Sequence, residues 1–199
     1  MVERQLRRRE ITDERVLEAM AAVPREEFVP EEMRRHAYRD GALRIAAGQT
    51  ISQPWIVARM AELLELEGPE RVLEVGTGSG YAAAVLSRLC SHVVTIERHA
   101  TLAAAATATL ERLGYRNVEV RHGDGSQGAP DRAPFDGISV TATAAGEPPR
   151  ALREQAAPGA PLVMPLERGG RELLVRVRGS AVETVTPVRF VPLVEGTED

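Results

Sequence analysis

The stretch from Val72 to Gly80 constrains the fold of this 199-residue chain more than any other. It reads Val-Leu-Glu-Val-Gly-Thr-Gly-Ser-Gly, so a short apolar run rich in β-branched residues leads into three glycines at alternate positions. Such a run is typical of a strand buried on both faces. Glycine has no Cβ, which lets the backbone turn tightly and approach a ligand closely. The alanine- and leucine-rich segment from Tyr81 to Cys90 indicates a helix, so the three parts together predict a nucleotide-binding corner.

The spacing of the glycines distinguishes between nucleotides. The dinucleotide fingerprint G-x-G-x-x-G would need a glycine at position 81, which is Tyr81 here. The observed pattern, E-x-G-x-G-x-G from Glu74 to Gly80, resembles motif I of the S-adenosylmethionine-dependent methyltransferases with a Rossmann-like fold. That cofactor carries positively charged amino and sulfonium groups, and the carboxylate of Glu74 is the candidate partner for them. The motif alone leaves open a glycine-rich turn that binds no ligand.

A second acidic residue supports a nucleoside ligand. Glu97 ends the β-branched run 91–97 and lies 21 positions after Gly76. This is close to the ~20-residue interval at which a carboxylate binds ribose hydroxyls in such folds. An acid at the end of a strand is otherwise usually a solvated loop residue, but its position after this turn favours ribose binding.

Composition and charge exclude several classes of protein. With 43% hydrophobic and 27% charged residues the sequence is that of an ordinary globular protein. Its formal net charge of −4 argues against a nucleic-acid partner, which would usually require a basic face. The single cysteine, Cys90, excludes an intramolecular disulfide and a multi-cysteine metal site, so we expect it in the core and predict no metal.

Alternating helices and strands predict the fold class. Beyond Glu97 we expect helices at residues 99–113 and 149–157, and strands at residues 117–121, 135–140, 161–165, 172–178 and 182–190. Gly179-Ser180 is a turn signal, so the last two strands form a hairpin. This order predicts a doubly wound α/β domain whose mostly parallel sheet ends in an antiparallel C-terminal strand pair.

The segment before the glycine motif predicts a helical cap over one end of the sheet. Residues 1–35 indicate two helices, the first with Thr12 as its expected N-cap, and residues 56–66 indicate a further helix. Residues 36–55 lack periodicity but are dense in polar and aromatic side chains, which is typical of a functional loop.

We therefore predict a single domain over residues 1–199, in which residues 1–66 face the substrate and residues 67–199 bind the cofactor. No apolar run approaches the ~18 residues of a membrane span. The N-terminus lacks the apolar region of a signal peptide. We expect a cytoplasmic monomer with no membrane partner.

The chain as a whole resembles the protein-L-isoaspartate (D-aspartate) O-methyltransferase family. Gly48-Gln-Thr-Ile-Ser-Gln-Pro54 is the diagnostic stretch, because other methyltransferases of this fold lack it. The other matching stretches occur in family order at residues 24–30, 37–40, 72–81, 95–97, 113–118, 123–125, 133–136 and 188–193. The resemblance implies methyl esterification, with S-adenosylmethionine, of the free carboxylate of L-isoaspartyl or D-aspartyl residues in damaged proteins and peptides. Repair would follow through a succinimide.

The resemblance also assigns roles to individual residues. Ser52 matches the active-site serine, Glu97 the ribose-binding acid, and the other matching cofactor-binding residues are Gly76, Thr77, Gly78, Asp124 and Gly125. The residues themselves add Thr50 as a second candidate for binding the substrate carboxylate, and Glu74 and Gly80 as cofactor-binding candidates. From the residues alone, Ser52 before Gln53-Pro54 is better interpreted as a helix cap. Asp124 between two glycines is equally well a turn residue.

Departures from the family pattern leave rival functions open. The family's proline-rich approach to the diagnostic stretch is replaced here by residues 42–47, with Arg44 in place of a proline. The alternatives are a related carboxyl methyltransferase that acts on one dedicated peptide, and a non-catalytic S-adenosylmethionine-binding protein. A dehydrogenase is disfavoured because position 81 is not glycine.

Overall fold

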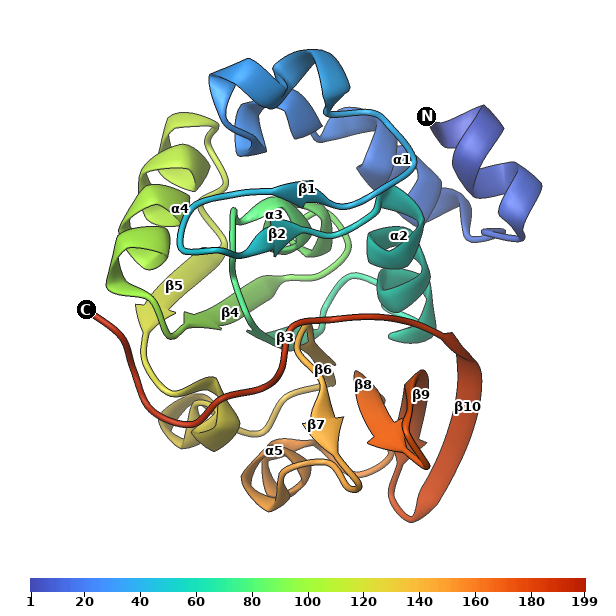
Figure 1. Ribbon diagram of the computed structural model, residues 1–199. Helices are drawn as coiled ribbons and strands as arrows, with labels where there is room; N and C mark the ends of the chain where they lie inside the picture. The colour runs from blue at the N-terminus through green and yellow to red at the C-terminus, as the bar shows by residue number, and fades with distance from the viewer.

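A mixed β-sheet lies at the centre of the computed structural model, which describes all residues from Met1 to Asp199 (Figure 1). Its strands run in the order β10-β9-β8-β6-β3-β4-β5, and β7 pairs with β8. The strands are β3 (Arg71–Val75), β4 (His92–Glu97), β5 (Val118–His122), β6 (Gly137–Val140), β7 (Ala144–Ala145), β8 (Leu162–Arg168), β9 (Arg171–Arg178) and β10 (Ala181–Pro187). A separate hairpin joins β1 (Leu43–Arg44) and β2 (Thr50–Ile51).

Five α-helices and several shorter helical turns surround the sheet. The α-helices are α1 (Glu14–Ala22), α2 (Pro54–Leu63), α3 (Tyr81–Leu86), α4 (Ala100–Arg112) and α5 (Arg150–Gln155). The shorter turns are η1 (Val2–Leu6), η2 (Arg7–Arg9), η3 (Arg25–Phe28), η4 (Glu31–His36), η5 (Gly125–Gln127) and η6 (Pro130–Arg132). None of these helices is both long and apolar enough to span a bilayer.

The direction of the chain changes at β3. From β3 it passes through α3 to β4 and through α4 to β5, and all three strands are parallel. It then returns to β6, which pairs in parallel with the opposite edge of β3. In sheets of this kind a ligand binds outside the carboxyl ends of the strands, at the point where the strand order reverses. That point lies between the ends of β3, β4 and β6.

Two apolar cores form because successive side chains of a strand point to opposite faces of the sheet. Val72 and Val93 belong to a core of 30 buried residues that also contains side chains of α1, α2 and α3. Leu73 and Val94 belong to a core of 14 buried residues on the other face, together with Leu152 of α5. Residues of segment 1–66 thus share one core with the central strands.

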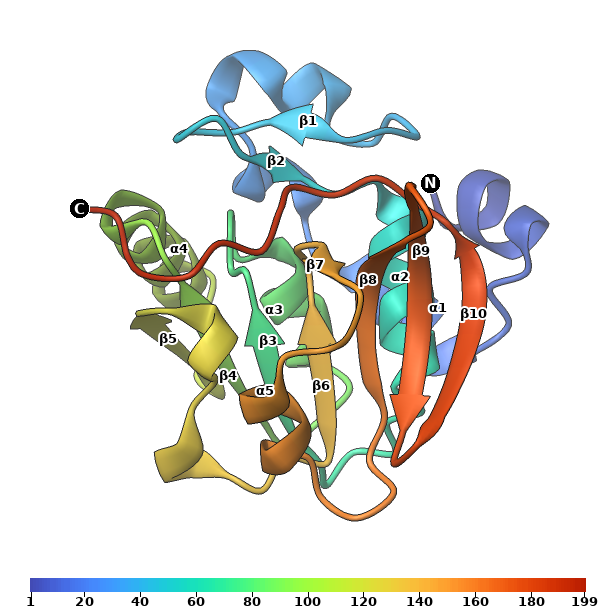
Figure 2. The same cartoon turned by 60° about the horizontal axis from the view of Figure 1, so that its bottom comes forward.

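The carboxyl end of the sheet is covered by two segments distant in sequence. Figure 2 shows the β1–β2 hairpin and the C-terminal segment after β10 crossing above the end at which β3 stops. The C-terminal segment is attached through Thr143, whose N–H donates to Val191 O at 2.8 Å and whose carbonyl accepts from Leu193 N–H at 2.8 Å. Farther along, Glu198 N–H donates to Arg98 O at 2.7 Å.

The predicted fold class is confirmed, including the antiparallel pairing of β8, β9 and β10 at the C-terminal end of the sheet. Two details of the N-terminal segment differ. Residues 1–35 contain one α-helix, α1, and otherwise π- and 3₁₀-helical turns. The loop 36–55 contains the β1–β2 hairpin, whose strands are too short to produce a periodic pattern in the sequence. Cys90 is buried, as expected.

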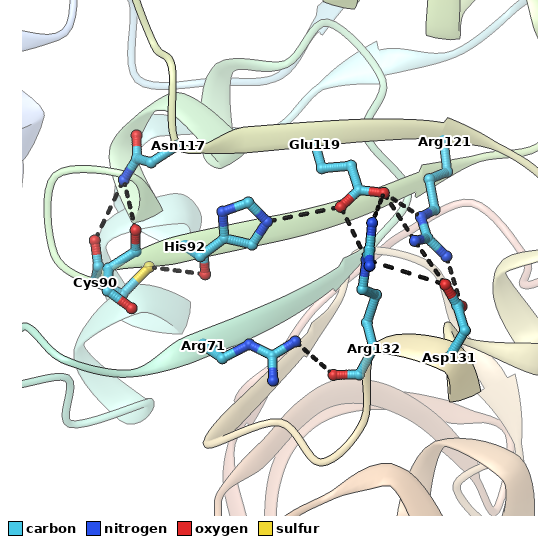
Figure 3. Close-up of polar contacts among 9 residues, drawn as sticks. Arg71, Cys90, His92, Asn117, Glu119, Arg121, Asp131 and Arg132 are labelled. Carbon is cyan, nitrogen blue, oxygen red and sulfur yellow. Dashed lines mark hydrogen bonds and ion pairs between the residues drawn. The ribbon is translucent and has the colours of Figure 1, made fainter.

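A cluster of charged side chains lies on one face of β5, the edge strand of the sheet, and of the neighbouring β4 (Figure 3). Glu119 is hydrogen-bonded by Arg121 Nε at 2.8 Å and by Arg132 Nε at 3.2 Å, and Arg121 also binds Asp131 at 2.7 Å. His92 lies 3.7 Å from the Glu119 carboxylate. Charged side chains at the edge of a sheet disfavour pairing with a further strand.

The N-cap of α1 is Asp13 rather than the predicted Thr12. The Asp13 carboxylate accepts from Arg15 N–H at 2.8 Å and from Val16 N–H at 3.2 Å, which satisfies two free amides of the first turn. Thr12 instead donates its N–H to Glu62 at 2.8 Å.

Replacing Asp13 by alanine removes this cap, so we expect Asp13→Ala to lower the free energy of unfolding by about 1 kcal/mol. Thr12→Ala is the matched control and keeps its backbone contact with Glu62, so its effect should stay below about 0.5 kcal/mol. Urea denaturation followed by circular dichroism measures both. A larger effect at Thr12 than at Asp13 would contradict the assignment of the cap.

Candidate active site

A cavity of about 520 Å³ lies at the carboxyl ends of β3, β4 and β6. Its volume is within the range of pockets that bind small molecules. Its lining comes mainly from the hairpin and the start of α2, the glycine turn after β3 with the α3 helix, the ends of β4 and β6, and residues Thr186 to Val194 near the C-terminus. The cavity therefore lies where the strand order reverses, and the hairpin and the C-terminal segment of Figure 2 cover it.

The glycine turn forms part of the floor of the cavity. Gly76, Thr77 and Gly78, three of the predicted cofactor-binding residues, line the cavity. Gly76 has φ +94°, and a Cβ at this position would collide with Thr141 Oγ1. Thr141 Oγ1 donates to the carbonyl of Gly76 at 2.9 Å or of Val75 at 3.0 Å, so the end of β6 fixes this turn.

Glu97 connects the end of β4 to the glycine turn. Its Oε2 accepts from Gly78 N–H at 2.7 Å, and its Oε1 accepts from His99 N–H at 3.0 Å. The residue is 4% exposed and lines the cavity. Each carboxylate oxygen has further lone pairs, so this group can accept hydrogen bonds from the two hydroxyls of a ribose.

Glu74 does not line the cavity, so its predicted contact with the charged groups of the cofactor stays a prediction. The side chain is fully buried, and its Oε2 accepts from Thr95 Oγ1 at 2.6 Å. Thr95 Oγ1 lies 2.7 Å from Thr77 Oγ1, so Glu74 supports the turn through two hydroxyls. Burial, with a smaller contribution from the charge of Glu97, raises the pKa of Glu74 to about 8.

Two other predicted residues also lie outside the cavity lining. Gly80 faces α4, where a Cβ would lie 3.2 Å from Leu110 Cδ1, so this glycine allows close helix packing. Asp124 caps η5, and its Oδ1 accepts from Ser126 N–H at 2.9 Å. Gly125 does line the cavity, and a Cβ there would lie only 2.5 Å from Val75 Cγ1. The turn interpretation of Asp124 is thus the one that its contacts satisfy.

Ser52 and Thr50 line the same cavity as Glu97 and Gly78, from the side of the hairpin. Gln53 rather than Ser52 occupies the N-cap of α2, and no side chain caps this helix. The helix-cap interpretation of Ser52 is therefore wrong. Its carbonyl accepts from Arg25 Nη2 at 2.7 Å, whereas its hydroxyl has no hydrogen-bond partner within the chain. A free hydroxyl at a cavity wall is available to a ligand.

Three further residues that were not among the predicted site residues also line the cavity. Trp55 donates its Nε1–H to Arg9 O at 3.0 Å, and the Arg9 guanidinium lies 4.4 Å from the centre of its ring. His99 is 8% exposed, with Nδ1 3.1 Å from Glu198 Oε2. These contacts, between Trp55 and Arg9 and between His99 and Glu198, join residues far apart in sequence, so no local sequence pattern predicts them.

The arrangement is suited to aligning two bound molecules. One side of the cavity offers a glycine turn and a carboxylate for a nucleoside, and the other offers two hydroxyls. The structure contains no cluster of three or more metal-ligating His, Cys, Asp or Glu side chains. Ser52 has no general base as a partner, so the site lacks an activated nucleophile of its own. Fold and site together define the class of S-adenosylmethionine-dependent methyltransferases with a Rossmann-like fold.

Sequence comparison identifies the family within this class. A family model described as protein-L-isoaspartate(D-aspartate) O-methyltransferase matches residues 1–198. A protein-L-isoaspartate O-methyltransferase of Roseiflexus castenholzii is 54% identical over 195 residues, which cover 95% of this chain and 88% of that protein. One of Serratia proteamaculans is 51% identical over 195 residues, which cover 96% and 93% of the two chains. The chain belongs to the protein-L-isoaspartate(D-aspartate) O-methyltransferase family.

Solved structures agree with this assignment. One is a Plasmodium falciparum protein described as a putative protein-L-isoaspartate O-methyltransferase and crystallised with S-adenosyl-L-homocysteine. It superposes with a TM-score of 0.85 at 25% identity, and the match covers 97% of this chain and 96% of that protein. Another protein-L-isoaspartate O-methyltransferase superposes with a TM-score of 0.82 at 30% identity, covering 96% of this chain and 65% of its own. S-Adenosylmethionine is the cofactor of this protein.

The buried carboxyl group of Glu74 makes stability depend on pH. Its pKa in the folded protein, about 8, is above its ordinary value of 4.5, so the folded state binds the proton more tightly than the unfolded state. Considering this group alone, the free energy of unfolding is therefore greatest below pH 4.5 and decreases as the pH rises toward 8. Glu74→Gln keeps an oxygen that can accept from Thr95, and it removes the decrease in stability that ionisation of Glu74 causes.

We expect Glu74→Gln to raise the free energy of unfolding at pH 8 by up to about 4 kcal/mol, and by much less at pH 5. Urea denaturation of both proteins at the two pH values measures the difference. A gain that is equal at pH 5 and pH 8 would show that Glu74 does not titrate in this range.

Glu97 can be tested by its effect on cofactor affinity. Glu97→Gln replaces one charged acceptor oxygen by an amide, so we expect the Kd for S-adenosylhomocysteine to rise about 10- to 100-fold. Glu111→Gln, at an exposed position of α4, is the matched control. Isothermal titration calorimetry gives both constants. Unchanged affinity in Glu97→Gln would exclude a contact of this carboxylate with the ligand.

Proposed function

We propose that this protein transfers the methyl group of S-adenosylmethionine to the free carboxylate of L-isoaspartyl residues in damaged proteins and peptides. One observation carries the proposal: Ser52 and Thr50 line the same cavity as Glu97 and the glycine turn. A carboxylate held at the two hydroxyls therefore lies within the same enclosed space as the sulfonium of a cofactor whose ribose is bound by Glu97.

The reaction requires alignment more than activation. A carboxylic acid with an ordinary pKa of about 4 is already ionised at pH 7, so its oxygen attacks without a general base. The carboxylate oxygen forms a bond to the methyl carbon while the bond from carbon to sulfur breaks, and the sulfonium leaves as a neutral thioether. The negative and positive charges disappear together. Positioning of the two groups and exclusion of water are the contributions left to the protein.

Ser52 orients the substrate in this scheme. Its hydroxyl donates a hydrogen bond to one carboxylate oxygen, which leaves the other oxygen directed at the methyl group. Thr50 is exposed on β2 beside the cavity and provides a second donor. Arg44, which differs from the family pattern, is exposed and faces Thr50 across the hairpin. This difference from the family pattern therefore lies on the exposed side of the hairpin, at the end of the cavity where the substrate binds. It does not alter the glycine turn after β3.

The methyl ester leads to repair without further help from the protein. The backbone nitrogen that follows the esterified residue attacks the ester carbonyl, and methanol leaves as a succinimide forms. Water then opens the ring at either carbonyl, which returns part of the material as normal aspartate. The D-aspartyl residue presents a similar carboxylate and is a second substrate class for the same site.

The setting of the enzyme is part of the proposal. We infer a single domain over residues 1–199, because segment 1–66 shares its core with the central strands. A monomer is supported by the charged cluster on β5, which disfavours pairing of that edge with a second copy.

The test compares two synthetic peptides that differ only in isoaspartate or aspartate at one position. With labelled S-adenosylmethionine, we expect base-labile label on the isoaspartyl peptide alone. Ser52→Ala should lower kcat/KM about 10- to 100-fold because it removes a hydrogen bond to a charged group. Ser180→Ala, in the exposed β9–β10 turn, is the matched control.

Each negative result identifies a rival. Cofactor binding without transfer to either peptide would contradict the proposal and favour a dedicated substrate or an inactive binding protein. Full activity in Ser52→Ala would leave the proposed reaction intact but contradict the role proposed for the Ser52 hydroxyl.

A further inference from the structure

Arg25 carries a positive charge into the interior directly behind the substrate loop. It belongs to η3, and its side chain is fully buried. Its Nε donates to Ala37 O at 2.7 Å and its Nη2 donates to Ser52 O at 2.7 Å. The guanidinium lies 4.6 Å from the centre of the Tyr81 ring. Arg25 thus joins the loop that carries Ser52 to the first residue of α3.

No carboxylate compensates this charge. Both hydrogen-bond acceptors of Arg25 are neutral carbonyl oxygens, its Nη1 has no hydrogen-bond partner, and no Asp or Glu forms an ion pair with it. Buried charges are ordinarily paired, because removing an ion from water is costly. Burial lowers the pKa of Arg25, but a guanidinium remains protonated at neutral pH.

The other cations near the cavity differ in this respect. Arg9 is paired with Asp40 at 3.1 Å, and Arg98 is paired with Glu198 at 2.8 Å. Arg189 has no ion-pair partner, but it is exposed, so water and salt screen its charge. Among these arginines, only Arg25 combines burial with the lack of a counter-ion.

Arg25 does not itself line the cavity, whereas Ser52 and Tyr81 on either side of it do. The electric field of its charge therefore reaches the substrate end of the cavity through protein rather than through water. Because the dielectric constant of the protein interior is low, this field is much stronger than it would be in water. A carboxylate bound at Ser52 would supply the missing negative charge.

We propose that Arg25 is a specificity-determining residue, whose buried and uncompensated charge makes the substrate end of the cavity select an ionised carboxylate over a neutral side chain of the same shape. The inference rests on the proposed function, since it takes Ser52 as the site of the carboxylate. In this proposal Arg25 acts on the bound carboxylate through its electric field.

The kinetic consequence follows from the charge balance of the reaction. The carboxylate loses its negative charge as the methyl group is transferred, so the cation stabilises the bound substrate more than the transition state. Removing the charge should therefore raise KM for the isoaspartyl peptide about tenfold and raise kcat by no more than about threefold. A residue that only holds the loop in place would instead lower kcat when it is removed.

The experiment measures binding of two matched peptides, one with isoaspartate and one with isoasparagine, to the protein saturated with S-adenosylhomocysteine. Wild-type protein should bind the isoaspartyl peptide more tightly. In Arg25→Met this preference should fall about tenfold, and in Arg25→Lys, which restores a cation, it should recover to within about threefold of the wild type. Steady-state kinetics of the same variants gives the KM and kcat values.

Arg15→Met is the matched control. Arg15 also donates to two backbone carbonyls, of Leu66 and Leu89, but it is not part of the cavity lining. Its replacement should leave the preference unchanged. Affinity for S-adenosylhomocysteine verifies that each variant is folded, and Arg25→Gln, which keeps hydrogen-bond donors without the charge, replaces Arg25→Met if the latter does not bind the cofactor product.

Equal weakening of both peptides in Arg25→Met would overturn the proposal and leave Arg25 a purely structural residue. Equal binding of both peptides by the wild type would overturn it as well. These results are distinct from failure of the proposed function, in which wild-type protein binds the cofactor product but transfers no methyl group to the isoaspartyl peptide.

Discussion

The hydrogen bond from Gly78 N–H to Glu97 Oε2, 2.7 Å long, joins the turn after β3 to the end of β4, and the geometry of the site depends on it. It can form because β3 and β4 are parallel and in register, with Val75 opposite Ile96, so that both strands end at the same edge. Gly76 is fixed from the other side by Thr141, which follows β6. The cofactor end of the cavity is thus a direct product of strand pairing. Its acidic group is held by backbone amides and retains lone pairs for a ligand.

The substrate end is built in another way. It consists of a short hairpin outside the central sheet and of the C-terminal segment that continues from β10, and both cross the carboxyl end of the sheet. Arg25 ties the hairpin loop to the body of the protein through Ser52. Two independent parts of the chain therefore meet over one cavity, which suits a reaction that must align two molecules.

Much of this architecture could be predicted from the sequence, because it is encoded locally. Buried strands, alternating helices and the glycine turn each leave a pattern within about ten residues, and the spacing from Gly76 to Glu97 reflects one strand–helix–strand unit. The predicted N-cap of α1 differs by one residue from the observed one, because Thr12 and Asp13 are both good caps and both donate their N–H groups to Glu62. The sequence does not reveal that the Glu74 side chain accepts a hydrogen bond from Thr95 of the neighbouring strand, because this contact depends on the pairing of β3 with β4.

Other features depend on contacts between distant segments, which leave no local pattern. Arg25 reaches Ser52 across 27 positions, and Glu198 reaches His99 from the far end of the chain. The most direct test of the account is a crystal structure with S-adenosylhomocysteine and an isoaspartyl peptide bound together. We expect the ribose hydroxyls at Glu97, and the peptide carboxylate at Ser52 facing the sulfur of the cofactor product. A peptide carboxylate bound outside this cavity, or a ribose without contact to Glu97, would contradict it.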